Sequence, residues 1–390
     1  MKVFIVCNSL GAGGAERVGV NLANGFTRYG HQACIITDIY QKASYPVDNA
    51  VKVLPLCPKD KGKIQRWTGA IVNLRRYIKQ ERPDAIIGIM HLCSAVARIA
   101  TIGTKVPVVM TIHHALESDT YKFSKTEQFL DRHTPCFYKA TTVLTHPDKD
   151  CLGDRKNIFV MPNPVTFTAV KKLPQKEKVI LAAGRLTDWK YKGWDILIKA
   201  WKGLSPTLPR REGDSWWLKI AGTGNTDSIN YLKSLLADAE WIQTAGGWKT
   251  EKYHIEFLGY RTDMEQLFQR ASIFVLSSRS EGLPMVLIES MSQGCAPIAT
   301  DFKGRTKEVL DMTSTTSKKE GAQHIIEVGE NGVTCNPEDA DALATGIQRL
   351  MKDDDLRQSI QNHAVERSKY YALPNIISMW ENLLKQIVHK

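Results

Sequence analysis

Two glutamates in the segment Ser280–Glu289 have the spacing and setting of groups that bind a polyol. Glu281 is expected in the loop after a buried strand that ends at Leu276, and Glu289 about two turns along the next helix. Both carboxylates can then face one ligand at different depths, and each can accept hydrogen bonds from two sugar hydroxyls. Gly282 allows close approach of that ligand, and the first amides of the helix can bind an anion. In the alternative interpretation, Glu281 complements the helix dipole and Glu289 is an exposed helix residue.

Arg185 and Lys192 flank a loop that follows the predicted strand 179–183. Ligands of open parallel sheets bind outside the carboxyl ends of the strands. Two fixed cations at that edge can neutralise a diphosphate and stabilise negative charge on a leaving group. Lys190 lies in the same loop and competes with Lys192 for this role. The alternative is a set of solvated surface cations.

A glycine-rich turn, Gly11–Gly14, joins the predicted first strand to the first helix. Its backbone N–H groups at a helix N-terminus suit a phosphate. The turn matches a dinucleotide-binding fingerprint only in part, because Glu16 stands where the third glycine is required, although Asp38 ends the second strand. A nicotinamide-dependent oxidoreductase is therefore an alternative, and so is a tight turn without a ligand.

Strand-sized apolar runs alternate with helical patterns along the chain, which predicts an α/β fold with doubly wound parallel sheets. The alternation weakens near residues 163–178 and then starts again, so two Rossmann-like domains of similar size are expected. We predict domains at residues 1–170 and 171–372, followed by an amphipathic helix at 373–390.

Composition excludes several classes of protein. The apolar fraction of 43% and charged fraction of 24% are typical of a globular chain. The longest apolar runs are strand-sized, so neither a transmembrane helix nor a secretory signal is expected. The eight cysteines show no CxxC-like spacing, which gives no support to a disulfide framework or a zinc site. No metal cluster is predicted.

The formal net charge of +11 lies entirely in the first half of the chain. Up to Lys172 there are 24 basic and 13 acidic residues, whereas the remainder is neutral. A nucleic-acid-binding protein is disfavoured, because the second half is neutral and no recognition module is present. The one-sided charge instead indicates two halves with different partners.

Much of this excess lies between Lys59 and Arg82, around a predicted helix at residues 64–80. Its apolar side is a stripe at helical spacing: Ile64, Trp67, Ile71, Leu74 and Ile78. Such a helix can lie on an anionic membrane surface and bring the first domain to a lipid-linked acceptor. The alternative is a helix that packs its stripe on the sheet and leaves its basic residues in water.

Taken together, these motifs resemble the GT4 family of retaining glycosyltransferases. They occur in the family's order and cover nearly the whole chain: Gly13-Gly14-Ala15-Glu16-Arg17, Asn163-Pro164-Val165, Gly184-Arg185-Leu186, Lys192-Gly193 with Asp195, and Glu281 with Glu289. The resemblance implies a GT-B architecture, in which two Rossmann-like domains face each other across a cleft. The first domain would hold the acceptor and the second a nucleotide-sugar donor, and the C-terminal helix would cross back to the first domain.

The resemblance also implies roles for single residues. Arg185 and Lys192 would hold the donor diphosphate, with Lys190 as the competitor created by a loop longer than the family's. Glu281 would contact the transferred sugar and Glu289 the nucleotide ribose. His113, or its neighbour His114, would lie near the sugar and acceptor. Backbone groups near the donor would come from Gly13, Gly14, Gly282, Leu283, Met285 and Val286.

The expected enzyme is a metal-independent, retaining hexosyltransferase that uses a nucleotide sugar, with UDP favoured as the nucleotide. Its acceptor is expected to be a lipid-linked glycan in cell-surface polysaccharide assembly, with a soluble acceptor as the alternative. No cofactor is expected, because the fixed cations supply the positive charge that a metal would bring. The protein is expected in the cytoplasm, peripheral on the inner face of the cell membrane. The sequence does not specify the sugar, the base or the oligomeric state.

Overall fold

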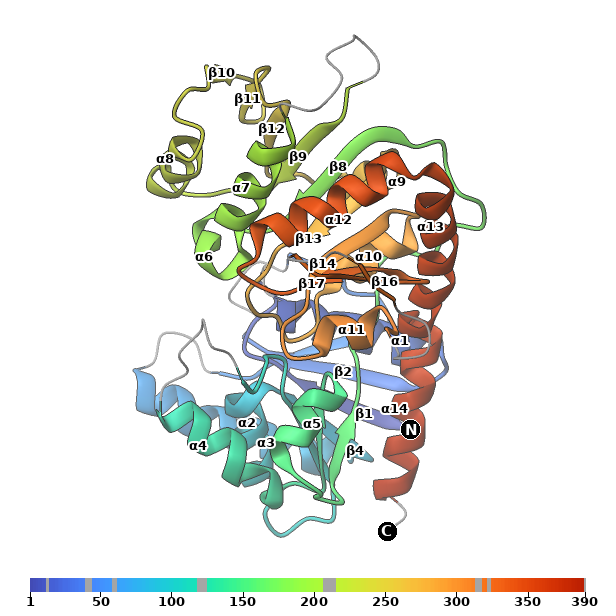
Figure 1. Cartoon of the computed structure of the whole chain (residues 1–390). Helices are drawn as coiled ribbons and strands as arrows, with labels where there is room; N and C mark the ends of the chain where they lie inside the picture. Colours follow the sequence, from blue (N-terminus) through green and yellow to red (C-terminus); the bar gives the residue numbers. More distant parts are fainter. Residues whose placement is uncertain are drawn as a thin grey trace. The chain divides into compact units, whose positions relative to one another are not determined.

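The computed structural model describes residues 1–11, 14–38, 44–57, 62–117, 125–205, 215–312, 318–320 and 324–388. Residue contacts divide the chain into two units. The first comprises Met1–Glu117, Phe123–Thr166 and Tyr371–Lys390, and the second spans Phe167–Tyr370. Figure 1 shows that each unit is built on a sheet with helices packed against it.

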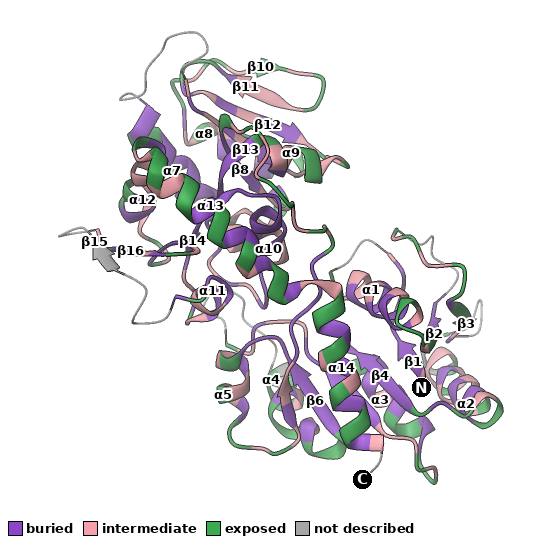
Figure 2. Cartoon of the chain, turned by 90° about the vertical axis from the view of Figure 1, so that its right-hand side faces the viewer, coloured by how far each residue is buried: buried purple, intermediate pink, exposed green. Residues whose placement is uncertain are grey.

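The first unit contains a seven-stranded sheet of order β3-β2-β1-β4-β5-β6-β7 in which every neighbouring pair is parallel. Its strands are β1 (Lys2–Val6), β2 (Gln32–Thr37), β3 (Lys52–Pro55), β4 (Ala85–Ile89), β5 (Val108–Thr111), β6 (Ala140–Val143) and β7 (Ile158–Val160). The central strands are buried on both faces, drawn in purple in Figure 2, as expected for a parallel sheet covered on both sides. The predicted doubly wound α/β fold is confirmed for this unit.

Six helices surround this sheet among the residues that the structure describes: α1 (Gly14–Arg28), α2 (Lys63–Glu81), α3 (Met90–Ala100), α4 (Lys125–His133), α5 (His146–Leu152) and α14 (Leu373–Val388). The C-terminal helix α14 belongs to the first unit and packs on α1. Gly25 permits the close approach, because a Cβ there would lie 2.6 Å from a methyl carbon of Ile377. The apolar face of α14 is buried in the same core as α1, with Ile377, Trp380, Leu383 and Leu384 all inside.

The second unit contains a ten-stranded sheet of order β10-β11-β12-β9-β8-β13-β14-β17-β16-β15. Its strands are β8 (Glu177–Ala183), β9 (Trp217–Ala221), β10 (Ile242–Gln243), β11 (Trp248–Thr250), β12 (Ile255–Gly259), β13 (Ala271–Leu276), β14 (Ala296–Thr300), β15 (Lys318–Glu320), β16 (Ile326–Gly329) and β17 (Gly332–Cys335). The six central strands, in the spatial order β12-β9-β8-β13-β14-β17, are parallel neighbours. Antiparallel strands extend the sheet at both edges. The parallel centre confirms the sequence prediction, which did not foresee the short edge strands.

The described helices of the second unit are α6 (Trp189–Lys192), α7 (Trp194–Leu204), α8 (Thr226–Ser234), α9 (Met264–Arg270), α10 (Met285–Ser292), α11 (Arg305–Val309), α12 (Ala340–Lys352) and α13 (Asp354–Ser368). Among the described residues, single-turn 3-10 segments are η1 (Thr134–Phe137) in the first unit, and η2 (Leu186–Asp188) and η4 (Lys369–Tyr371). Side-chain caps fix several helix starts. Asp353, for example, accepts a hydrogen bond from the Leu356 amide and so begins α13.

The apolar stripe of α2 packs inward. Leu74 and Ile78 are buried, and Trp67 and Ile71 are partly buried against the same core cluster. The side chain of Ile64 and residues Lys59 and Lys61 lie outside the described residues. Of the two geometries considered from the sequence, the structure therefore shows the stripe on the sheet side of the helix. Across the described residues, no helix combines the length and apolar character needed to cross a bilayer.

Candidate functional site

An ion pair joins the two sequence motifs of the second unit. The Lys192 ammonium lies 2.5 Å from Glu281 Oε1, and the Ser278 hydroxyl donates to the same oxygen over 2.7 Å. Both side chains are largely buried, with 19% of Lys192 and 13% of Glu281 exposed. Lys192 ends α6 and Glu281 lies between β13 and α10, so the pair lies at the carboxyl end of the central strand β13.

Gly193 holds Lys192 in this position. Its φ of +64° is in the left-handed region, and a Cβ there would lie 1.9 Å from the Ser277 carbonyl oxygen. The Ser277 hydroxyl also donates to the Lys192 carbonyl over 3.0 Å. Only glycine allows the loop to approach the end of β13 so closely, which explains the Lys-Gly pair in the sequence.

Arg279 ties the same two loops together, and the sequence analysis missed it. Its guanidinium forms two 2.8 Å bonds to the Asp195 carboxylate and donates to the Lys190 carbonyl over 2.6 Å. It also pairs with Glu338. Burial opposes the ionised form of Asp195, but the bonds from Arg279 outweigh it and lower the pKa of that carboxyl. Asp195 was quoted as part of the Lys-Gly motif, and the structure shows it as the partner that orients Arg279.

The other two predicted cations are exposed. The Arg185 side chain follows β8, is 79% exposed, and pairs with Asp188 over 3.0 Å. The Trp194 indole donates to the Arg185 carbonyl and fixes its backbone next to α7. Lys190 is exposed, whereas Lys192 reaches Glu281. The two lysines of this loop therefore have different surroundings.

The N-terminus of α10 supplies the backbone groups expected near a donor. The helix begins at Met285 without a side-chain cap, directly after the turn that contains Gly282 and Leu283. The Met285 amide donates to the Leu283 carbonyl over 2.8 Å. The remaining first-turn amides, such as that of Val286, lack a side-chain cap, as is characteristic of anion-binding helix ends. Glu289 lies in the second turn and is 6% exposed. The alternative interpretation of Glu289 as an exposed helix residue is wrong.

Tyr191 and Arg305 also border this site, although no sequence motif singled out the tyrosine. The pKa of Tyr191 is raised, chiefly by burial and also by the neighbouring Glu281. Hydrogen bonding to Ser280 and the charge of Arg305 offset only part of this increase. Arg305, in α11, is 1% exposed and is among the largest buried side chains. The charge of Arg305 in α11 thus acts on Tyr191, which precedes Lys192.

The candidates in the first unit lie after β5 and at the start of α1. Burial and the neighbouring His114 together lower the pKa of His113 to about 4, with Asn163 offsetting part of the effect. Both ring nitrogens of His113 are buried without a hydrogen-bond partner of normal geometry among the described residues. Gly14 begins α1, and a Cβ added there would meet no atom within 4 Å. Gly13 lies outside the described residues.

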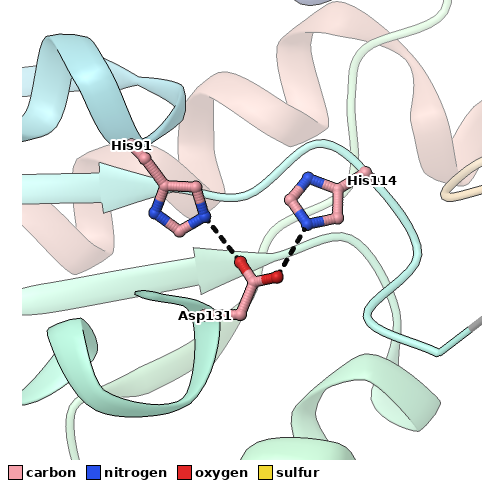
Figure 3. Close-up of side chains that lie close together, drawn as sticks. All are labelled: His91, His114 and Asp131. Carbon is pink, nitrogen blue, oxygen red and sulfur yellow. Dashed lines mark hydrogen bonds and ion pairs between the residues drawn. The ribbon is translucent and has the colours of Figure 1, made fainter. Parts of the chain in front are cut away.

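A cluster of two histidines and an aspartate, missed from the sequence, includes His114, the residue next to His113 in the chain. His91 Nε2 is 2.6 Å from Asp131 Oδ1, and His114 Nε2 is 3.1 Å from Asp131 Oδ2 (Figure 3). Burial raises the pKa of Asp131, but hydrogen bonds from His114 and His91 outweigh this and lower it to about 2. The three residues have no motif spacing, so only the fold brings them together.

In chemical terms, the second unit combines a buried carboxylate, a lysine ammonium, an exposed arginine and a helix N-terminus without a side-chain cap at one sheet edge. Such a set can bind a diphosphate and hydroxyl groups together. The acidic group at the end of β2 has a different partner, because Arg66 pairs with Asp38 over 2.7 Å. The Asp38 carboxylate is thus engaged within the first unit.

Both units match family models of sugar-transferring enzymes. Residues 177–353 match the family described as Glycosyl transferases group 1. Residues 12–168 match the family described as Glycosyltransferase Family 4. The two matches cover most of each unit and support no oxidoreductase.

Relatives of full length are glycosyltransferases. An uncharacterized glycosyltransferase from Haemophilus influenzae is 25% identical, with 98% of this chain and 99% of that protein covered. An α-1,4-N-acetyl-D-galactosaminyltransferase from Campylobacter jejuni, named for an undecaprenol-diphosphate-linked glycan, is 26% identical with 99% of each chain covered. The amylovoran biosynthesis glycosyltransferase AmsD from Erwinia amylovora is 24% identical, with 98% and 99% covered.

Solved structures share the fold of the whole chain. HepE from Anabaena, in complex with UDP and glucose, has a TM-score of 0.72 and 17% identity, with 99% of this chain and 100% of that chain covered. Sucrose-phosphate synthase from Thermosynechococcus elongatus has a TM-score of 0.74 and 16% identity, with 99% and 98% covered. At these identities the likeness establishes the fold.

Proposed function

The chain belongs to the GT4 family of glycosyltransferases and has the GT-B fold, and we propose that it is a retaining enzyme that transfers a hexose-type sugar from a UDP-sugar to a lipid-linked glycan. The reaction breaks the bond between the anomeric carbon and the β-phosphate oxygen of the donor, and forms a new bond to an acceptor hydroxyl. The hydroxyl proton leaves with the nucleoside diphosphate. HepE, which was solved with UDP and glucose, supports the choice of nucleotide.

The single observation that carries this proposal is the contact of Lys192 and Ser278 with one oxygen of Glu281. It places a cation and a hydroxyl-binding carboxylate side by side at the carboxyl end of β13, next to the N-terminus of α10. Glu281 accepts hydrogen bonds from the sugar hydroxyls. Lys192 then neutralises the diphosphate, and the α10 amides bind its oxygens.

Negative charge grows on the diphosphate as the glycosidic bond breaks. Preorganised donors stabilise such charge most effectively when they are held by the protein before the reaction. Lys192 meets this condition because Gly193 and Ser277 fix its backbone. Arg185 is exposed at the end of β8 and supplies the second cation, so the donor half of the reaction needs no metal ion. Glu289, buried one turn deeper, binds the ribose.

The lipid-linked acceptor is supported by the Campylobacter relative, which is named for such an acceptor, and by the surface of the first unit. Apolar side chains are exposed at Val72 on α2 and at Ile99 and Ile102 at the end of α3. Basic Arg76 and Lys79 lie exposed on the same α2 helix. A patch of apolar and basic residues favours an anionic bilayer surface. We therefore place the enzyme on the inner face of the cell membrane as a peripheral protein.

Arg75 connects the two helices of this patch. Its guanidinium donates to the carbonyls of Ala100 and Ile102, over 3.0 Å and 2.7 Å. It thereby caps the C-terminal end of α3 and holds Ile102 beside α2. Arg75 is thus a structural part of the patch, while Arg76 and Lys79 are available to anionic lipid.

A panel of nucleotide sugars tests the donor assignment. Purified protein is incubated with UDP-, GDP- and ADP-sugars, and release of the nucleoside diphosphate is measured without acceptor. Slow hydrolysis of one UDP-sugar, abolished in Glu281→Gln, supports the proposal. If only a GDP- or ADP-sugar is hydrolysed, the assignment of UDP as the nucleotide is wrong. If Glu281→Gln hydrolyses the donor as fast as the wild type, the assignment of Glu281 to the donor site is wrong. Lys199→Gln, an exposed lysine on α7 away from the ion pair, is the matched control.

A further inference from the structure

We propose that His91, His114 and Asp131 form a binding site for a divalent transition-metal ion of the zinc class in the first unit. One nitrogen from each imidazole and one carboxylate oxygen all lie within 4.8 Å of one another. Figure 3 shows both rings directed at the same carboxylate. None of these residues belongs to the donor site of the second unit. His114 is also the alternative to His113 as the residue near the sugar and acceptor, but the inference does not depend on that role or on the proposed function.

The fold creates this cluster from three distant segments. His91 lies in the first turn of α3, directly after β4, and His114 follows β5. Since β4 and β5 are parallel neighbours, their carboxyl ends meet at one edge of the sheet. Asp131 reaches that edge from α4. This is the edge at which open parallel sheets bind ligands.

The donor set suits a borderline metal ion. Two neutral imidazole nitrogens and one carboxylate are preferred ligands of zinc and its first-row neighbours, whereas calcium and magnesium prefer oxygen ligands alone. Zinc binds nitrogen and oxygen at about 2.0–2.2 Å, so donor atoms around one ion lie roughly 3–3.5 Å apart. The present atoms lie within 4.8 Å of one another, so side-chain rotations would have to bring them to that spacing. Each imidazole would give up the proton that it now shares with the carboxylate.

The burial of the cluster leaves one side accessible. The Asp131 side chain is 5% exposed, while His91 and His114 keep 18% and 19% of their side-chain surface exposed. The Asp131 carboxylate thus lies in the interior, and the two histidine rings are partly exposed. An ion can therefore reach the cluster from solvent on the histidine side. Three protein ligands leave at least one coordination position for water or another small ligand, as in accessible zinc sites.

The backbone at the cluster is also constrained. Met90, immediately before His91, has a φ of +66°, which is rare for a residue with a side chain. Its amide donates to the Thr111 hydroxyl on β5 over 3.4 Å. Backbone conformations of this kind occur where the surroundings fix a side chain in place, often at functional sites. Here the result is the orientation of the next residue, His91.

The competing explanation is a hydrogen-bonded cluster without an ion, in which two neutral histidines donate to an ionised aspartate. Metal content distinguishes the two. Untagged protein is equilibrated with zinc, dialysed extensively against metal-free buffer, and analysed by elemental mass spectrometry. About one zinc ion per chain is expected, because three protein ligands retain the metal through dialysis. His91→Gln, His114→Gln and Asp131→Asn should each lose this zinc.

The matched control is His324→Gln. His324 also lies beside two carboxylates, Asp339 and Asp341, but among the described residues no second histidine joins them. It should retain the zinc of the wild type. Circular dichroism checks that each variant is folded, and Asp131→Asn keeps the size of the buried side chain. Zinc should also raise the melting temperature of the wild type but not of His91→Gln. The inference would be overturned if the wild-type protein retained no zinc, or if all three cluster variants retained as much zinc as the wild type.

Discussion

Lys192 and Glu281 are 89 positions apart in the chain, yet the Lys192 ammonium lies 2.5 Å from a Glu281 carboxylate oxygen. The loop before α7 and the loop before α10 therefore form one site. Under the proposed function, the diphosphate of a bound donor would compete with Glu281 for the lysine. The carboxylate would then become available to the sugar hydroxyls, so that one pre-formed pair would recognise both ends of the donor.

Glu281 and Glu289 should have separable roles. Glu281→Gln should reduce transfer far more than it weakens UDP binding, because the lost charge contacts the sugar rather than the nucleotide. Glu289→Gln should weaken UDP itself. Calorimetric titration with UDP and a transfer assay measure the two quantities, and equal effects of both variants on UDP affinity would refute this division.

The sequence predicted the parallel centres of both sheets because their strands are apolar runs that alternate with helical patterns. It could not predict the edge strands, such as the two-residue β10, since they carry too few residues for a periodic pattern. Lys192, Gly193 and Glu281 were found through motifs, whereas Arg279 was not. Its role depends on Asp195, a contact that only the folded chain creates.

The histidine cluster shows the same limit. His91, His114 and Asp131 have no ligand-like spacing, and the parallel pairing of β4 with β5 brings the two histidines together. Glu289 illustrates another limit. The short apolar helix α10 is buried all round, so helical spacing could not show that its glutamate points away from solvent.

Chelation should leave donor hydrolysis intact, because Arg185 and Lys192 supply the positive charge at the leaving diphosphate. Arg185→Ala should lower the hydrolysis rate by roughly 10²-fold, the scale of removing one transition-state donor. The assay measures UDP release without acceptor in the presence of EDTA. EDTA removes any ion from the proposed site of the first unit, so that ion cannot affect the measured rate. A strict requirement for added magnesium or manganese would contradict the prediction.

His113 should make the protein less stable in mild acid. Its pKa is about 4 in the folded chain against an ordinary value of 6.5, so between these limits the unfolded chain binds more protons. Stability is therefore full above about pH 6.5 and falls as the pH decreases toward 4, by about 2 kcal/mol at pH 5.

His113→Gln should remove this part of the pH dependence, as measured by chemical denaturation at about pH 7 and pH 5. Asp131 does not contribute in this range, because its lowered pKa of about 2 affects stability only below its ordinary value of 3.8. An unchanged difference in stability between the two pH values in His113→Gln would show that another group is responsible.

Vesicle binding should depend on the basic face of α2. Reversing Arg76, Lys79 and Arg82 to glutamate should release the protein from anionic vesicles, since each basic residue near such a surface contributes about 1 kcal/mol. Donor hydrolysis should remain, because the donor residues belong to the second unit. Arg75 is left intact, since it holds the end of α3.

The control reverses three exposed lysines of the second unit, Lys171, Lys172 and Lys199, and changes the net charge equally. Sedimentation with vesicles should separate the two triple variants. Trp67→Ala should lower the melting temperature rather than vesicle binding, because Trp67 packs against the core of the first unit. Equal binding of both triple variants would favour a soluble acceptor.

The stereochemistry of the transferred sugar tests the central claim most directly. The protein is incubated with the UDP-sugar that it hydrolyses and an acceptor glycan, and the anomeric proton of the product is observed by NMR. An α-linked donor should give an α-linked product and free UDP, and Glu281→Gln should give neither. A β-linked product, or full transfer by Glu281→Gln, would contradict a retaining reaction at the Lys192–Glu281 site.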